Sequence, residues 1–264
     1  MNKIKELYDY REMIFSLVRK ELRGRYKATV LGFLRNFINP LLQLIVYTLV
    51  FSVIMRAGIE KYYLFLFVAL VPWIFFSSAL TGGAMCIINS QDLVKKIYFP
   101  REVLPISFTT STFVNMLLSF VVVFAVLIAT GYGINPAACL FLPLIMVVEY
   151  IICLGTCMLF CSLTVYFRDL QNILAVIAMA WQFLTPVMYG QEMVESALAN
   201  HPVMMTIWNY NPTTPLINAY REILYYKQIP NMRYVSMALL LGVAVCVIGW
   251  VTFEKLQRGF AEEL

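Results

Sequence analysis

The chain has 264 residues, of which 61% are hydrophobic and 13% charged, and its formal net charge is +5. The charged fraction is about half of that in an ordinary soluble domain, so most of the chain cannot face water. Composition therefore excludes a soluble globular protein and predicts an all-α integral membrane protein, built as one domain over residues 1–264.

Residues 1–36 predict a cytoplasmic helix that lies along the membrane surface and leads into the first span. Apolar side chains recur at helical spacing, and basic side chains occupy other positions, where they would meet anionic headgroups. The apolar set is Ile4, Leu7, Ile14, Val18 and Leu22. The segment is no signal peptide, because it lacks a compact apolar core and a small-residue cleavage site. It either only anchors the chain or helps to admit an anionic substrate.

Six apolar runs follow, each near the roughly 20 residues that a membrane helix needs. They are Phe37–Met55, Tyr62–Ile88, Val103–Gly131, Ala137–Phe167, Leu170–Gln191 and Tyr234–Phe253. The turn GYGINP at 131–136 separates the third run from the fourth, because Gly and Pro break the helix. Glu149 in the fourth run is the one charged residue inside them. The sequence predicts six spans.

The short charged segment NSQDLVKKIYFPREVLP, residues 89–105, separates the second and third runs. Asn89 or Ser90 is expected to cap a helix of about two turns, whose start Asp92 favours and which Pro100 stops. Its apolar side chains would form one surface that faces the cytoplasm within a charged rim. These side chains are Leu93, Val94, Ile97 and Phe99.

Residues 191–233, between the fifth and sixth runs, are too polar and proline-rich to form another crossing. Pro202, Pro212 and Pro215 are expected to divide them into short helices that dip partly into the outer leaflet. Irregular backbone at that depth is tolerated only beside protein or a water-filled cavity. We expect a re-entrant lid over an outer exit.

Lys and Arg residues predict the orientation, since positively charged segments stay in the cytoplasm. With both termini inside, the cytoplasmic pieces hold 15 of the 20 basic residues and the outer pieces hold five. The segment 89–105 therefore faces the cytoplasm.

The six cysteines all lie in apolar runs, so they supply no disulfide framework. Cys153, Cys157 and Cys161 share one helix face, which could indicate a metal or redox site. Small packing residues are the favoured interpretation, because no histidine or nearby carboxylate completes a ligand set. No metal is expected.

Catalytic motifs are absent from the sequence. There is no phosphate-binding G-x-x-x-x-G-K-[ST] loop, no D-x-D pair for a sugar nucleotide and no histidine partner for a nucleophile. We expect no catalytic residues and no nucleic-acid partner, and the energy for any uphill transport must come from a partner protein.

Four blocks resemble the permease subunits of type 2 ABC exporters of polysaccharides and polyol phosphates, the O-antigen and teichoic-acid group. They are residues 25–52, 72–105, 165–174 and 211–224, which include PWIFFSSALTGGAMCIINSQDLVKKIYFPREVLP, VYFRDLQNIL and NPTTPLINAYREIL. The resemblance covers nearly the whole chain. It implies a homodimeric permease in the cytoplasmic (inner) membrane of a bacterium, which exports a polymer attached to a polyprenyl pyrophosphate lipid.

The resemblance also implies a separate cytoplasmic ATP-binding subunit in two copies. That partner would use ATP and Mg, and the chain itself would bind no cofactor. Pyrophosphate would enter at a basic cluster, although positive-inside topology explains the same charges. The cluster consists of Arg19, Lys20, Arg23, Arg25 and Lys27.

The segment 89–105 would be the coupling helix, which docks in a groove of the ATPase; the alternative is a loop helix lying flat on the membrane. Candidate coupling residues are Leu93, Val94, Ile97, Phe99, Pro100, Arg168 and Asp169. Glu149 would point into the conduit or the dimer interior, or it is a protonated packing residue.

Other classes stay open at this point: an exporter of another lipid or drug, a membrane-embedded lipid-processing enzyme, and a self-contained channel or secondary transporter. An enzyme would need acidic or histidine groups clustered at one membrane face. A secondary transporter would need ionisable groups within its spans, where Glu149 is alone.

Overall fold

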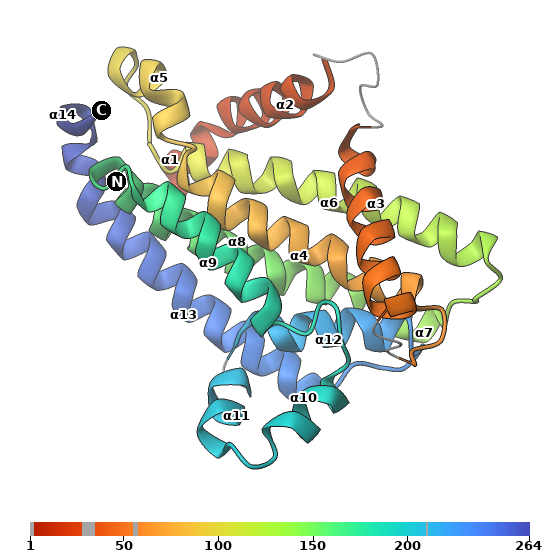
Figure 1. Ribbon diagram of the computed structural model, residues 1–264. Helices are drawn as coiled ribbons and strands as arrows, with labels where there is room; N and C mark the ends of the chain where they lie inside the picture. The colour runs from red at the N-terminus through yellow and green to blue at the C-terminus, as the bar shows by residue number, and fades with distance from the viewer. Residues whose placement is uncertain (1–2, 28–34, 55–57, 210) are drawn as a thin grey trace.

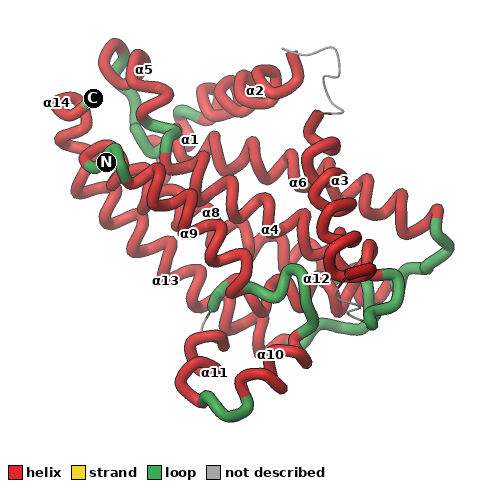
Figure 2. Tube along the Cα trace, in the orientation of Figure 1, coloured by secondary structure: helices red, strands yellow, loops and turns green. Residues whose placement is uncertain are grey.

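The computed structural model describes residues 3–27, 35–54, 58–209 and 211–264, and every regular element in these ranges is a helix (Figures 1 and 2). The longer helices are α2 (Arg11–Lys27), α3 (Arg35–Thr48), α4 (Tyr62–Ala84), α6 (Val103–Ala129), α8 (Leu142–Tyr166), α9 (Leu170–Leu184), α12 (Thr213–Leu224) and α13 (Met232–Leu256). The shorter ones are α1 (Lys3–Asp9), η2 (Leu49–Ile54), η3 (Ile88–Ser90), α5 (Gln91–Lys96), α7 (Pro136–Cys139), α10 (Gln191–Leu198), α11 (Pro202–Asn209), η4 (Gln257–Gly259) and α14 (Phe260–Glu263). The prediction of an all-helical chain is confirmed.

Within the described ranges, four helices are long and apolar enough to cross a membrane by length and composition. They are Tyr62–Ala84, Val103–Ala129, Pro136–Tyr166 and Met232–Gly259, which match the second, third, fourth and sixth predicted runs. The first and fifth runs contain shorter apolar helices, Pro40–Ile54 and Leu170–Leu184. The six-span count therefore stays a prediction.

Helix α4 forms the centre of the bundle. It is apolar around its whole circumference, and 17 of its 23 residues are buried. A helix that is hydrophobic on all sides has to be surrounded by other elements, and α4 packs against α3, α6, α8, α9 and α12.

Helices α8 and α13 form a close pair because each carries a glycine at the crossing. A Cβ at Gly249 would overlap the carbonyl oxygen of Gly155, and a Cβ at Gly155 would lie 2.5 Å from the backbone of Cys246. Small residues let membrane helices approach closely, so α13 lies directly against α8 along the bundle (Figure 1).

The two ends of the bundle differ. We call the end that carries both termini, α5 and α14 the termini end, and the opposite end, which carries α7 and α10–α12, the far end (Figure 1). Residues 191–233 contain α10, α11 and α12, and Pro215 does not separate two helices as predicted. It lies in the first turn of α12, where a proline costs no helical hydrogen bond.

Candidate functional site

The predicted short helix in segment 89–105 is confirmed as α5, at the termini end. It begins after Ser90, whose side chain makes no capping hydrogen bond, and it ends at Lys96, before Pro100 is reached. Asp92 and Lys96 form an exposed ion pair with a distance of 3.7 Å between Oδ1 and Nζ. Segment 89–105 thus presents one and a half helical turns, followed by extended backbone.

The apolar surface expected on this segment is corrected by the structure. Val94 and Phe99 are buried in a cluster of the chain's own side chains, which includes Phe253 and Phe260. Ile97 and Tyr98 are instead the exposed apolar residues, at 54% and 90% exposure.

The cause of this difference is the backbone after α5. Ile97 has extended φ and ψ angles of −131° and 136°, so the helical spacing on which the expected apolar surface depends ends there. Tyr98 is exposed and Phe99 is buried. Leu93 and Pro100 are half-buried, and the coupling role of all these residues stays a prediction.

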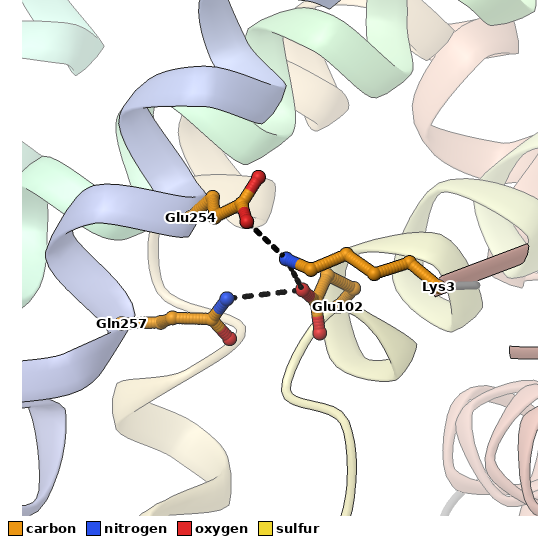
Figure 3. A network of polar contacts seen from close by, with 4 residues as sticks. All are labelled: Lys3, Glu102, Glu254 and Gln257. Atoms are coloured by element: carbon orange, nitrogen blue, oxygen red, sulfur yellow. Dashed lines mark hydrogen bonds and ion pairs between the residues drawn. The ribbon is translucent and has the colours of Figure 1, made fainter. Parts of the chain in front are cut away.

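A polar network joins three elements at the termini end (Figure 3). The ammonium of Lys3 lies 3.3 Å from Oε1 of Glu102 and 2.9 Å from Oε1 of Glu254. The side-chain amide of Gln257 donates to Glu102 at 3.0 Å. Burial lowers the pKa of Lys3, but the hydrogen bonds and charges of Glu254 and Glu102 outweigh it, so the net pKa is raised. The network ties α1 to the start of α6 and the end of α13.

The C-terminal segment, residues 257–264, connects this network to Arg168, another of the predicted coupling residues. Arg101 donates to the carbonyl oxygen of Gln257 and lies 5.7 Å from the ring centroid of Phe260. Arg168 donates to the carbonyl of Glu263 at 3.4 Å. Asp169 is exposed at the N-cap position of α9. The structure thus brings Arg168 to the same end as α5.

Sequence reasoning missed the contribution of the C-terminal segment. Phe253 and Phe260 are both fully buried and their rings make an edge contact, with centroids 5.6 Å apart. Two aromatic residues seven positions apart share one helix face, and this spacing is the signal that could have indicated a docked tail.

The predicted basic cluster lies on α2. Arg19, Lys20 and Arg23 are exposed, whereas the side chains of Arg25 and Lys27 lie outside the described part of the structure. The opposite side of α2 packs against α6 and the apolar cluster at the termini end through Met13, Ile14 and Leu17. The described basic side chains are therefore free to meet an anionic group.

Glu149 lies inside the protomer, at 3% exposure. Its Oε2 accepts a hydrogen bond of 2.6 Å from the hydroxyl of Tyr220, which is equally buried. Because Tyr220 belongs to α12, this bond fixes segment 191–233 to α8. A role of Glu149 in the conduit stays a prediction. In the structure, Glu149 connects α8 to α12.

Of the three cysteines on one face of α8, Cys157 and Cys161 belong to the apolar cluster at the termini end and Cys153 to the main core. Among the residues that the structure describes, no group of three or more His, Cys, Asp or Glu side chains could hold a metal ion.

Asn211, in the fourth block of the resemblance, joins α9 to α12 at the far end. Its side-chain oxygen accepts from the indole N–H of Trp181 at 3.1 Å and from the backbone N–H of Thr213 at 3.1 Å. Its side-chain nitrogen donates to the carbonyl of Leu184 at 3.3 Å. A short polar side chain thereby holds the end of α9 against the start of α12.

Residues 12–225 match the family described as ABC-2 type transporter. The chain belongs to this family. It is 33% identical over 261 residues to the O-antigen export system permease protein RfbA of Myxococcus xanthus, covering 99% of this chain and 98% of the relative. Two proteins of the same name from Klebsiella pneumoniae are 31% and 30% identical over 255 residues, with 96% of this chain and 95% of each relative covered. The resemblance inferred from the four blocks is confirmed.

Membership of the ABC-2 type transporter family fixes several coarser conclusions. The chain is a multi-pass membrane protein and a transport subunit, and it is not an enzyme. An ATP-binding partner subunit completes such a transporter. The enzyme and the self-contained channel considered from sequence are thereby set aside.

Proposed function

We propose that this chain is the membrane-spanning subunit of an ATP-driven exporter of a polysaccharide, an O-antigen or teichoic-acid-like polymer, in the cytoplasmic membrane of a bacterium. The observation that carries the proposal is the end-to-end similarity to an O-antigen export permease, 98% of which is covered by this chain. The cargo would be attached to a polyprenyl pyrophosphate lipid, and the partner would use ATP and Mg.

Six spans are part of the proposal. Helices α3 and η2 continue one another for 14 and six residues, which at 1.5 Å per residue reach about 30 Å, the thickness of the bilayer core. Helix α9 has 15 residues and reaches about 22 Å, which is shorter than the bilayer core. To cross the membrane, it would need the residues that flank the helix to lie within the bilayer, or the bilayer to be thinner there. Residues 191–233 would form the re-entrant segment on the outer side, and both termini would lie in the cytoplasm.

A homodimer is also part of the proposal, and we place its interface on α3 and α9, which leave apolar side chains exposed. On α3 they include Leu42 and Ile45, and on α9 Val176 and Phe183, each at least 55% exposed. A second copy would cover these faces, and two ATP-binding subunits would dock on the two termini ends. Ile97 and Tyr98 on each protomer would enter the groove of one ATP-binding subunit.

Copurification tests this function most simply. An affinity-tagged chain, expressed with the ATP-binding subunit of its own organism and extracted in mild detergent, should retain that subunit in a one-to-one ratio. Lipid-linked polysaccharide from the same cells should stimulate ATP hydrolysis by the complex. A chain that retains no ATP-binding subunit, or a complex that ignores the polysaccharide but responds to another lipid or a drug, would contradict the proposal.

A further inference from the structure

A polar cavity of about 620 Å³ lies at the far end, between α4, α10 and α12. Its volume falls within the range of about 300–1,000 Å³ that is typical of small-ligand sites. Six polar side chains line it: Gln191, Glu192, Asn218, Arg221, Glu222 and Gln228. These six side chains distinguish the cavity from the apolar core around it.

Arg221 is the unusual member of the lining, because it is 2% exposed. Its guanidinium donates to the carbonyl oxygens of Phe65, Tyr189 and Val187 at 3.4, 3.0 and 2.6 Å. It also lies 3.6 Å from the ring centroid of Phe65. Among the described residues, no carboxylate lies within ion-pairing distance of it.

The three carbonyl acceptors take one N–H from each nitrogen of the Arg221 guanidinium. An arginine carries five N–H donors, so two have no acceptor among the described residues. A buried charge is costly unless it is paired and fully hydrogen-bonded. The fixed guanidinium at the cavity wall is therefore a preorganised donor for ligand oxygens.

The other polar groups supply acceptors and adaptable amides. Glu192 is exposed and Glu222 is half-buried, and one oxygen of Glu222 accepts from the backbone N–H of Asn231 at 2.9 Å. Asn218 donates to the side-chain oxygen of Gln191, so the amides of α12 and α10 meet across the cavity. Donors and acceptors thus line the same cavity.

Aromatic side chains complete the cavity, with Phe65, Tyr189 and Tyr226 in its lining. A sugar ring presents hydroxyl groups that both donate and accept, together with apolar C–H faces that pack on aromatic rings. A simple anion would be repelled by Glu192 and Glu222, and a lipid chain would fit the neighbouring apolar cavity of about 970 Å³ beside Trp181 and Trp208 better.

We propose that the far-end cavity binds one or a few sugar units of the exported polysaccharide as the polymer leaves the permease. This inference rests on the proposed function and adds a substrate site to it. Arg221 and the two glutamates would hold the hydroxyl groups, and the rings of Tyr189 and Tyr226 would pack against the sugar faces.

Protection of an introduced thiol tests this site. Gln228 is exposed at the cavity, and Asn200 is exposed outside it, so Gln228→Cys and Asn200→Cys are matched labelling positions. Each variant, in complex with the ATP-binding subunit in nanodiscs, is labelled with a polar maleimide, and the parent chain gives the background of the native cysteines. The probes are lipid-free polysaccharide from the surface of the source cells, dextran, and vesicles of phosphatidylglycerol.

The cell-surface polysaccharide should slow labelling of Gln228→Cys by about tenfold at about ten times its Kd, because the free fraction falls by 1 + [L]/Kd. Asn200→Cys should be labelled at an unchanged rate. Adding Glu192→Gln and Glu222→Gln, which keep the side-chain shape, should raise Kd by about tenfold or more, so that the same polysaccharide concentration slows labelling by only about twofold or less. This double change avoids Arg221, whose replacement would disturb the fold.

Unchanged labelling of Gln228→Cys, equal slowing at both positions, or equal protection by dextran or by phosphatidylglycerol would overturn the inference. A second measurement distinguishes a failure of the sugar site from a failure of the proposed function. It is the amount of surface polysaccharide in a strain that lacks the chain, with the parent chain supplied in trans. If the parent chain restores export while protection is absent, only the sugar site is wrong. If the parent chain restores no export, the proposed function itself fails.

Discussion

At the scale of single residues, the buried hydrogen bond between Glu149 and Tyr220 can be tested by substitution. Glu149→Ala leaves a buried hydroxyl without its acceptor, and we expect it to lower the free energy of unfolding by about 1 kcal/mol. Glu149→Gln keeps an acceptor oxygen and should retain the parent stability. Thermal unfolding in detergent measures both variants, and Tyr220→Phe is the matched removal of the donor.

Glu149→Gln also tests the predicted conduit role, because it removes the charge and keeps the bond. Altered export by a variant of normal stability would support that role. Parent-level export would leave Glu149 with its structural role alone. If Glu149→Ala and the parent chain have equal stability, the hydrogen bond between Glu149 and Tyr220 does not stabilise the fold.

Tyr98 and Phe99 are neighbours with opposite environments, at 90% and 5% exposure. Tyr98→Ala combined with Ile97→Ala should leave stability within about 0.5 kcal/mol of the parent. If the exposed pair anchors the ATP-binding subunit, the same double variant should weaken that complex by about 2 kcal/mol or more, roughly 30-fold in Kd. Phe99→Ala should instead destabilise the permease, by about 3–5 kcal/mol.

Binding of the ATP-binding subunit, measured by titration of the detergent-solubilised permease, distinguishes the two surfaces. Tight binding by the Ile97→Ala, Tyr98→Ala variant would show that the partner docks elsewhere.

Segment 89–105 also shows which features could be predicted from the sequence. The sequence predicted a short helix with Asp92 in its first turn, but it placed the end at Pro100, whereas the helix ends at Lys96 and the chain is extended at Ile97. The apolar face expected for a helix that continues to Pro100 is therefore not formed.

At the scale of elements, the close approach of α8 and α13 depends on two glycines. Gly249→Ala would place a methyl group against the carbonyl of Gly155, and we expect overpacking to cost about 1–3 kcal/mol. Gly24→Ala on α2 is the control, since no atom lies within 4 Å of its added Cβ. It should stabilise the helix slightly, because Gly is a poor helix former. Similar unfolding temperatures for both variants would contradict the close packing.

The basic cluster on α2 gives a second prediction for a whole element. Replacing Arg23, Arg25 and Lys27 together by Gln should weaken the stimulation of ATP hydrolysis by lipid-linked substrate, if the cluster recognises pyrophosphate. Lys5→Gln, on the exposed side of α1, is the control in the same terminal segment. Membrane insertion and dimer formation should be unchanged. Equal stimulation of the triple variant and the parent would assign the cluster to topology alone.

Most elements could be predicted from apolar runs and from Gly or Pro at their ends. The turn at 131–136 lies where expected, with Gly131 and Gly133 at positive φ and Asn135 capping α7. The contacts between elements could not be predicted, because they join residues that are distant in sequence. Examples are the contact of α12 with α8 through Tyr220 and the contact of the C-terminal segment with α5. The length of α9 was also shorter than its apolar run, because Thr185 is already extended.

At the scale of the whole molecule, the two ends of the bundle suit two different tasks. The termini end combines the exposed pair Ile97 and Tyr98 with a network that ties α1, α6 and α13 together, so movement of α5 would reach several helices at once. The far end holds the polar cavity beside Arg221. The proposed exporter uses the first end for its ATP-binding partner and the second for release of the polymer.

The central claim is that this chain exports a polysaccharide together with an ATP-binding subunit. The most direct measurement is the amount of surface polysaccharide in a strain that lacks the chain, with and without a copy supplied in trans. Our account predicts that the polymer accumulates inside the deletion strain, returns to the surface with the parent chain, and stays inside when the partner's ATP hydrolysis is blocked. Normal surface polysaccharide in the deletion strain, with no second copy of the gene, would contradict it.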